Sequence, residues 1–125
     1  MKIAIITAMP GESRAILGKA EQVQRSRQGD RRVFRCRMAA HDVTMVEAGM
    51  GMLNAGWAAT MLAGERPDLL LSAGFGGGVL PGLKVGDAVM AEGVLQCVGN
   101  GFERVETTFY GDHNPALPPR GVFIT

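Results

Sequence analysis

Continuous apolar runs alternate with segments of helical periodicity along the first part of the chain. Lys2–Ala8 and Leu69–Ala73 are apolar without alternation, which is typical of strands covered on both faces of a parallel sheet. A helix is expected from Pro10, which suits a first turn, to about Lys19, and another from about Leu53 to Ala63. This order of elements predicts an α/β fold with a largely parallel sheet.

A second strand pattern lies between the two expected helices. Val33–Ala39 alternates apolar side chains with arginines, and a short turn joins it to Val43–Glu47. The period of two predicts a hairpin of half-buried strands.

The remainder of the chain is less regular. Val85–Val98 is expected to form one long strand, bent at Gly93, and the residues from Gly99 onward to be rich in turns. The last residues, 122–125, have the composition of a strand, as if the chain stopped within or just before an element.

Composition adds one unusual feature, which is glycine. The chain has 125 residues, the size of one domain or a piece of one, and 18 of them are glycine, about twice the usual share. The excess gathers at Gly49–Gly51 and Gly74–Gly78. Clustered glycines indicate turns or backbone that approaches another group closely.

Charge and cysteine content limit the classes of partner and the cellular compartment that are expected. A net charge of +1 gives no general reason to bind nucleic acid, and the arginine-rich stretch 25–37 is interpreted as a solvated strand surface. Cys36 and Cys97 suggest neither a disulfide framework nor a zinc site, and both are expected to be buried thiols. Leu69–Leu83, the longest stretch without charge, is too short for a membrane span. A cytoplasmic protein with no membrane partner is expected.

Three candidate features follow expected strands. Glu12 comes after the first strand, Gly49–Gly51 after the hairpin, and Gly74–Gly78 after the Leu69 strand. Ligands of open α/β sheets bind at the carboxyl ends of strands. The glycine loops match neither the dinucleotide fingerprint nor a P-loop, so they are either plain turns or backbone concavities for an anion or a sugar.

Glu12 itself has two interpretations. It could stabilise a helix N-terminus, or it could be a general acid or base, which would require burial to bring its pKa towards neutrality. Glu47 is a second candidate carboxylate. His41 and His113 are interpreted as turn residues.

Four motifs in register give the chain a resemblance to a known family. It resembles the methylthioadenosine/S-adenosylhomocysteine nucleosidases of the nucleoside phosphorylase superfamily. The matching segments are Met1–Met9 with Glu12, Gly49-Met50-Gly51 with Asn54, Pro67–Gly74 with Gly76–Gly78, and Lys84-Val85-Gly86-Asp87.

The resemblance implies a three-layer α/β fold with a central mixed sheet, of which residues 1–125 would be the N-terminal half of a single domain. It also implies cleavage of a purine nucleoside N-glycosidic bond, with no metal and no cofactor. Glu12 would activate the attacking water, and Met50 and Gly51 would lie beside the sugar and its 5′ substituent. The purine would be packed by Phe75, Gly76 and Gly77.

A second activity within the superfamily stays open. Met9-Pro10-Gly11-Glu12 followed by Arg14 is similar to a phosphate-holding segment of the phosphorylases, in which Gly11 and Arg14 would bind phosphate. The phosphorylases carry a further arginine near the central glycine loop, where this chain has Ser72. Because phosphate needs several cationic donors, hydrolysis is favoured over phosphorolysis.

The resemblance further implies that leaving-group protonation and the ribose contacts come from a second half, so the 125-residue chain alone is expected to be inactive. A homo-oligomer, most simply a dimer, is expected because the 53–63 helix is apolar around much of its circumference. The alternatives from other classes are a non-catalytic nucleoside-binding module and an inert fragment.

Overall fold

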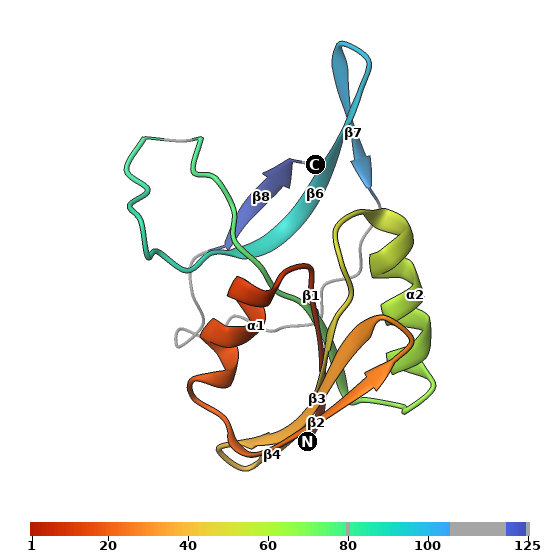
Figure 1. Ribbon diagram of the computed structural model, residues 1–125. Coiled ribbons are helices and arrows are strands. Elements are labelled where there is room, and N and C mark those ends of the chain that lie inside the picture. The colour runs from red at the N-terminus through yellow and green to blue at the C-terminus, as the bar shows by residue number, and fades with distance from the viewer. Residues whose placement is uncertain (80, 106–119, 125) are drawn as a thin grey trace. The chain divides into compact units, whose positions relative to one another are not determined.

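The first 77 residues build one compact unit around a five-stranded sheet (Figure 1). The computed structural model describes residues 1–79, 81–105 and 120–124. The strands of this sheet lie in the order β2-β3-β4-β1-β5. Their bounds are β1 Lys2–Thr7, β2 Glu21–Gln28, β3 Arg31–Met38, β4 His41–Glu47 and β5 Leu69–Ser72.

The sheet is mixed. β1 runs parallel to both β4 and β5, whereas β2, β3 and β4 form an antiparallel meander. The mixed sheet implied by the family resemblance is confirmed, and the largely parallel sheet expected from the element order is wrong. The β3–β4 hairpin, which the alternating pattern did predict, supplies one of the antiparallel pairs.

Two helices cover opposite faces of this sheet and complete three layers. Ala4 and Ile6 of β1 pack in a core cluster with Leu62 of α2 (Met52–Ala63). Ile5 lies in a separate cluster, against which Ile16 of α1 (Pro10–Leu17) packs. Successive side chains of a strand point to opposite faces, so alternate positions of β1 serve the two helices. Both predicted helices and the predicted three-layer fold are confirmed.

β2 is a strand that the sequence pattern did not reveal. Its side chains are exposed except for the half-buried Val23, and in the described part of the chain β2 is an edge strand, paired only with β3. A strand that buries so little needs no apolar alternation, and its charged side chains suit an edge open to water.

Residues 78 onward form a second compact unit with a three-stranded sheet, β7-β6-β8. β6 spans Met90–Val98, β7 Gly101–Val105 and β8 Arg120–Ile124. β6 pairs antiparallel with β7 and parallel with β8, and its register with β8 shifts between Ala91 and Gly93. This irregularity lies where a bend at Gly93 was expected.

One expectation for this unit is wrong, and another is tested only in part. The strand begins at Met90 and not at Val85, because Gly82 and Gly86 adopt φ values of +96° and +98° and residues 84–87 close a turn. The turns expected after Gly99 fall mainly at residues 111–119, which lie outside the described residues, but the pattern did not reveal the strand β7 that precedes them.

The two cysteines differ in exposure. Cys36 is buried on β3, as expected, but Cys97 is exposed. Cys97 pairs with the exposed Phe102 near the turn of the β6–β7 hairpin, so its apolar surroundings in the sequence do not become a core. Among the described residues, neither helix is long and apolar enough to cross a membrane.

Candidate active site

The carboxylate of Glu12 is held at the edge of the sheet where β1 and β5 end. Glu12 lies in the first turn of α1, and only 5% of its surface is exposed. Its Oε2 accepts hydrogen bonds from the backbone N–H groups of Ala8 (2.8 Å) and Met9 (2.9 Å). Its Oε1 accepts a third from the N–H of Phe75, at 3.0 Å. The loop after β5 therefore meets the loop after β1 at this one side chain.

The contact with Met9 also gives Glu12 a structural role. Met9 is the N-cap of α1, and a glutamate three positions on that binds the N-cap N–H satisfies a donor that the helix leaves unpaired. Both interpretations of Glu12 thus concern the same two oxygens. Helix stabilisation is observed, and it does not exclude chemistry at the same carboxylate.

One of the glycines near Glu12 is required by close approach. A Cβ placed on Gly74 would lie 2.6 Å from Oε1 of Glu12, a distance that real Cβ atoms do not tolerate. A Cβ on Gly11 would lie 3.4 Å from the ring of Phe75, in ordinary van der Waals contact. Gly74 therefore lets the β5 loop reach the carboxylate, which explains one member of the second glycine cluster.

Opposing effects set the pKa of Glu12. Burial disfavours the charged form and would raise the pKa, but the N–H groups of Phe75, Met9 and Ala8 stabilise the carboxylate and together outweigh burial. The pKa of Glu12 lies below its ordinary value. The sequence-based interpretation required a shift towards neutrality, so the direction of that expectation is wrong, and Glu12 is ionised at neutral pH.

Glu47, the second candidate carboxylate, is tied into a polar cluster at the end of β4. Its Oε2 accepts a hydrogen bond from Oγ of the buried Ser13, at 2.6 Å. Its Oε1 accepts from Nε (3.0 Å) and Nη2 of Arg32 on β3. The Ser13 bond fastens the first turn of α1 to β4, and the ion pair with Arg32 balances the charge of Glu47. Glu47 therefore supports the geometry of the site.

The remaining predicted substrate residues lie in the loops at this edge. Met50 and Gly51 follow β4, and the side chain of Met50 is 72% exposed. Phe75 bonds Glu12 through its backbone, whereas its side chain is 70% exposed and reaches towards Gly11. Gly76 and Gly77 are exposed. The structure brings Glu12, Gly11 and Phe75 together, and the substrate roles of the other residues stay predictions.

Arg14, the predicted phosphate residue, lies on the exposed side of α1. Its Nε donates to the carbonyl oxygen of Pro10, 3.2 Å away, one turn earlier in the same helix. This bond satisfies part of the guanidinium within α1. A role for Arg14 in holding phosphate stays a prediction.

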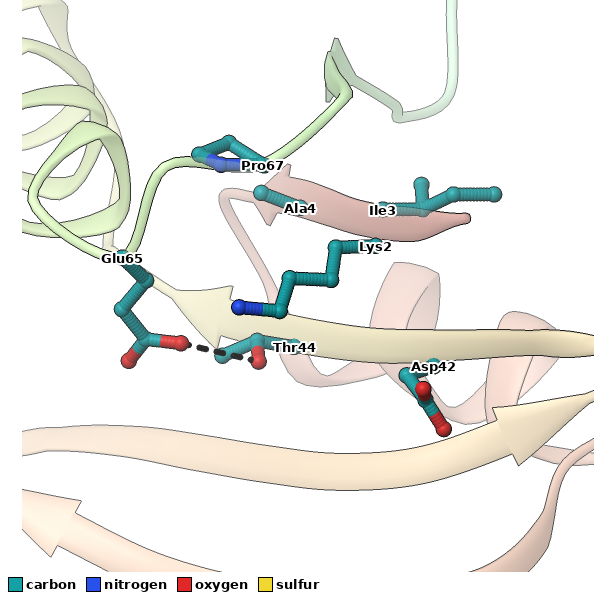
Figure 2. Close-up of a pocket in the computed structure, with 7 residues that line it drawn as sticks. All are labelled: Lys2, Ile3, Ala4, Asp42, Thr44, Glu65 and Pro67. Atoms are coloured by element: carbon teal, nitrogen blue, oxygen red, sulfur yellow. Dashed lines mark hydrogen bonds between the residues drawn. The ribbon is translucent and has the colours of Figure 1, made fainter.

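A pocket of about 310 Å³ lies at the other end of the strands, near the amino end of β1 (Figure 2). Figure 2 shows the Lys2 side chain extending towards Thr44 and Glu65 in this pocket; Oγ1 of Thr44 bonds Oε2 of Glu65 at 3.2 Å. Because ligands of such sheets bind at carboxyl ends, the edge at Glu12 remains the candidate site. Among the described residues, no three His, Cys, Asp or Glu side chains form a potential metal site.

Comparison with known proteins places the chain in a family. Residues 2–123 match the family model of the phosphorylase superfamily. The chain belongs to the phosphorylase superfamily. The resemblance carried by the four motifs is confirmed at this level.

This superfamily member is similar to nucleosidases. It is 31% identical over 124 residues to the 5′-methylthioadenosine/S-adenosylhomocysteine nucleosidase of Geobacillus kaustophilus, covering 96% of this chain and 50% of that protein. It is also 31% identical to the Streptococcus pneumoniae enzyme solved with a transition-state inhibitor, at a TM-score of 0.69, over 77% of this chain and 42% of that one. The chain thus spans about half the length of its relatives.

A more distant structure supports the fold over almost the whole chain. The Helicobacter pylori nucleosidase matches at a TM-score of 0.76 and covers 99% of this chain and 64% of its own, at 17% identity. At that identity the likeness concerns the fold alone.

The donors to Glu12 are what sequence reasoning missed. Ala8, Met9 and Phe75 act through backbone N–H groups, which every residue except proline carries, so their identities hold no signal. Gly74 carried the only hint, as a glycine with no evident turn to make.

Proposed function

We propose that this chain is the N-terminal half of a single-domain nucleosidase that hydrolyses the N-glycosidic bond of a purine nucleoside of the methylthioadenosine or S-adenosylhomocysteine type. Glu12 accepts a proton from the attacking water. The observation that carries the proposal is a buried, ionised carboxylate held by three backbone donors at the ligand edge of the sheet. The similarity to nucleosidases over 96% of this chain supports it.

The proposed reaction is dissociative. The bond from the sugar to the purine breaks with oxocarbenium character at the sugar, and water captures the cation while Glu12 takes its proton. Met50 and Gly51 line the sugar side of the site, and Phe75, Gly76 and Gly77 line the purine side. Groups that protonate the purine and bind the ribose hydroxyls belong to the part of the relatives that this chain does not cover.

The test is adenine release from methylthioadenosine by the intact gene product, in phosphate-free buffer and with increasing phosphate. Hydrolysis predicts free methylthioribose at a rate independent of phosphate. Sugar 1-phosphate formed in proportion to added phosphate would instead establish phosphorolysis, with Gly11 and Arg14 at the phosphate. Adenine binding in calorimetric titration without any turnover would establish a binding module.

Two further proposals concern the protein's state. We propose a homodimer, because Met50, Met52 and Leu53 form a run of exposed apolar side chains at the start of α2, and Leu53 is 92% exposed. Apolar side chains that gather on a surface are typical of protein interfaces. We also propose a cytoplasmic location, consistent with the purine substrate and with two cysteines, neither of which is in a disulfide.

A further inference from the structure

A hydrogen-bonded relay connects β3 with the loop that carries Met50. Nη2 of Arg31, the first residue of β3, donates to Oδ1 of Asn54 at 2.7 Å. Nδ2 of Asn54 in turn donates to the carbonyl oxygen of Met50, also at 2.7 Å. We call these three residues the Arg31 relay. It spans 23 positions in the sequence and ends on the backbone of the loop 49–51.

The guanidinium of Arg31 is itself fixed in place. Its Cζ lies 4.2 Å from the ring centroid of Trp57, one turn after Asn54 on α2. Arg31 is half-buried, and within the described residues its buried Nε has no hydrogen-bond partner. A cation held over an aromatic face and bonded at one end has a defined orientation, which lysine could not reproduce.

The loop at the end of the relay has a backbone that needs support. Gly49 and Gly51 adopt φ values of +91° and +95°, a region that glycine enters readily but holds only at an entropic cost. Nδ2 of Asn54 lies 3.2 Å from where a Cβ of Gly49 would be, so the amide packs against the loop. Asn54, a side chain of α2, bonds this loop through the carbonyl oxygen of Met50.

We propose that Arg31 is a positioning residue that acts through Asn54 to hold the Met50 loop in the conformation that receives the sugar end of the nucleoside. The inference rests on the proposed function, in which Met50 lies beside the 5′ substituent. The contacts of the Arg31 guanidinium are with Asn54 and Trp57. Arg31 orients the Asn54 amide so that its donor points at the Met50 carbonyl.

Three variants of the intact gene product separate the relay from the fold. Asn54→Asp keeps an acceptor for Arg31 but replaces the donor to Met50 with an oxygen that repels its carbonyl. Arg31→Lys keeps the positive charge but loses the planar stack on Trp57. Arg25→Ala removes an exposed arginine of the neighbouring strand β2 and is the matched control. Thermal unfolding identifies any variant that fails to fold, and Asn54→Asp and Arg31→Lys are independent tests of the relay.

Hydrogen exchange tests the relay without reference to activity. The amides where the Met50 loop enters α2, of which that of Ala55 donates to the carbonyl oxygen of Gly51 at 3.1 Å, should exchange about tenfold faster in Asn54→Asp and Arg31→Lys than in the wild type, the scale of one lost hydrogen bond. Arg25→Ala should leave their exchange unchanged. Unchanged exchange in both relay variants would overturn the proposal.

Kinetics tests what the relay is for. The KM for methylthioadenosine should rise about tenfold in Asn54→Asp with kcat within about threefold, since ground-state positioning is lost and the Glu12 region is intact. The affinity for adenine, which lacks the sugar, should change less than about twofold. An equal loss for both ligands, or an unchanged KM despite faster exchange, would overturn the positioning role. Absence of turnover in the wild type would refute the proposed function alone, because exchange still tests the relay.

Discussion

Replacing Glu12 by glutamine should cost stability as well as activity. Glutamine is nearly isosteric, so the change isolates the loss of charge and of one acceptor oxygen. Oε2 accepts from two N–H groups and Oε1 from one, so the new NH₂ group faces at least one backbone donor in either orientation. The orientation in which the NH₂ group faces Phe75 keeps the bonds that cap the helix, so it is the favoured one.

The magnitude follows from the bonds lost. A hydrogen bond to a charged group contributes roughly 1.5–3 kcal/mol, and its loss here leaves the Phe75 N–H against another donor. The two hydrogen bonds from Ala8 and Met9 persist, but their acceptor is then an uncharged oxygen. We expect a loss of about 2–3 kcal/mol in the free energy of unfolding at pH 7. In the proposed whole domain, about twice as long as this chain, such a loss lowers Tm by roughly 4–12 °C.

The pH dependence has a definite sign. Because the pKa of Glu12 is lower in the folded than in the unfolded protein, its contribution is complete above the unfolded value of about 4.3. That contribution disappears as the pH falls through the lower, folded pKa. The difference between wild type and Glu12→Gln should be largest at pH 7 and should shrink in strongly acidic buffer.

Urea unfolding at several pH values measures this difference, with Glu21→Gln on the exposed β2 edge as the control for losing a carboxylate. In parallel, kcat should fall at least about a hundredfold, the scale of a lost general base. A stability difference that is the same at pH 7 and pH 3 would refute the electrostatic argument. Near-wild-type turnover would remove Glu12 from the proposed mechanism.

Three further predictions use single measurements. Gly74→Ala should reduce kcat at least about tenfold and destabilise the protein by roughly 1–3 kcal/mol, because the added methyl group displaces the Glu12 carboxylate from its donors. Kinetics and thermal unfolding measure both effects. The control is Gly56→Ala, since a Cβ at Gly56 meets open space. Leu53→Asp should convert a dimer into a monomer in sedimentation velocity, and a wild-type monomer at micromolar concentration would contradict the proposed dimer. The exposed thiol of Cys97 should react rapidly with a disulfide reagent. Cys36 should react only on unfolding, because burial shields its thiol and raises its pKa. Two rapidly reacting thiols would contradict this prediction.

The sequence predicted those strands whose side chains form an apolar run or alternate in polarity. β1 and β5 appear as apolar runs, although β5 is an edge strand of the described sheet and is mostly exposed, not covered on both faces. The β3–β4 hairpin appears as an alternation because Arg35 faces water while Phe34 and Cys36 face the core. β2 was missed because it buries almost nothing, which leaves no pattern. The false extension of β6 to Val85 had the opposite cause. Residues 85–89 have a strand-like composition, but the positive φ of Gly86 interrupts the extended conformation there.

The candidate site divides in a similar way. Glu12 was predictable because its position after the first strand places it at the ligand edge, whatever its exact contacts. The direction of its pKa shift was not predictable, because it depends on the N–H of Phe75, which lies 63 positions away. The Arg31 relay was hidden for the same reason. Arg31 belongs to an arginine-rich stretch that appeared uniformly solvated, and only the tertiary structure distinguishes it by placing Trp57 under its guanidinium.

The lowered pKa of Glu12 fits the dissociative reaction proposed here better than a reaction that needs a strong base. A carboxylate that accepts three N–H bonds is a weaker base than a free one, so it is less suited to deprotonating water early in the reaction. Capture of an oxocarbenium-like sugar needs a less strong base, because the bound water becomes acidic as its oxygen bonds the cation. A carboxylate offers about four lone-pair positions, and the three backbone donors leave about one to orient that water. The bonds that cap α1 therefore also direct the remaining lone pair. Shortening the side chain in Glu12→Asp would retract the carboxylate from Phe75 and from the water together.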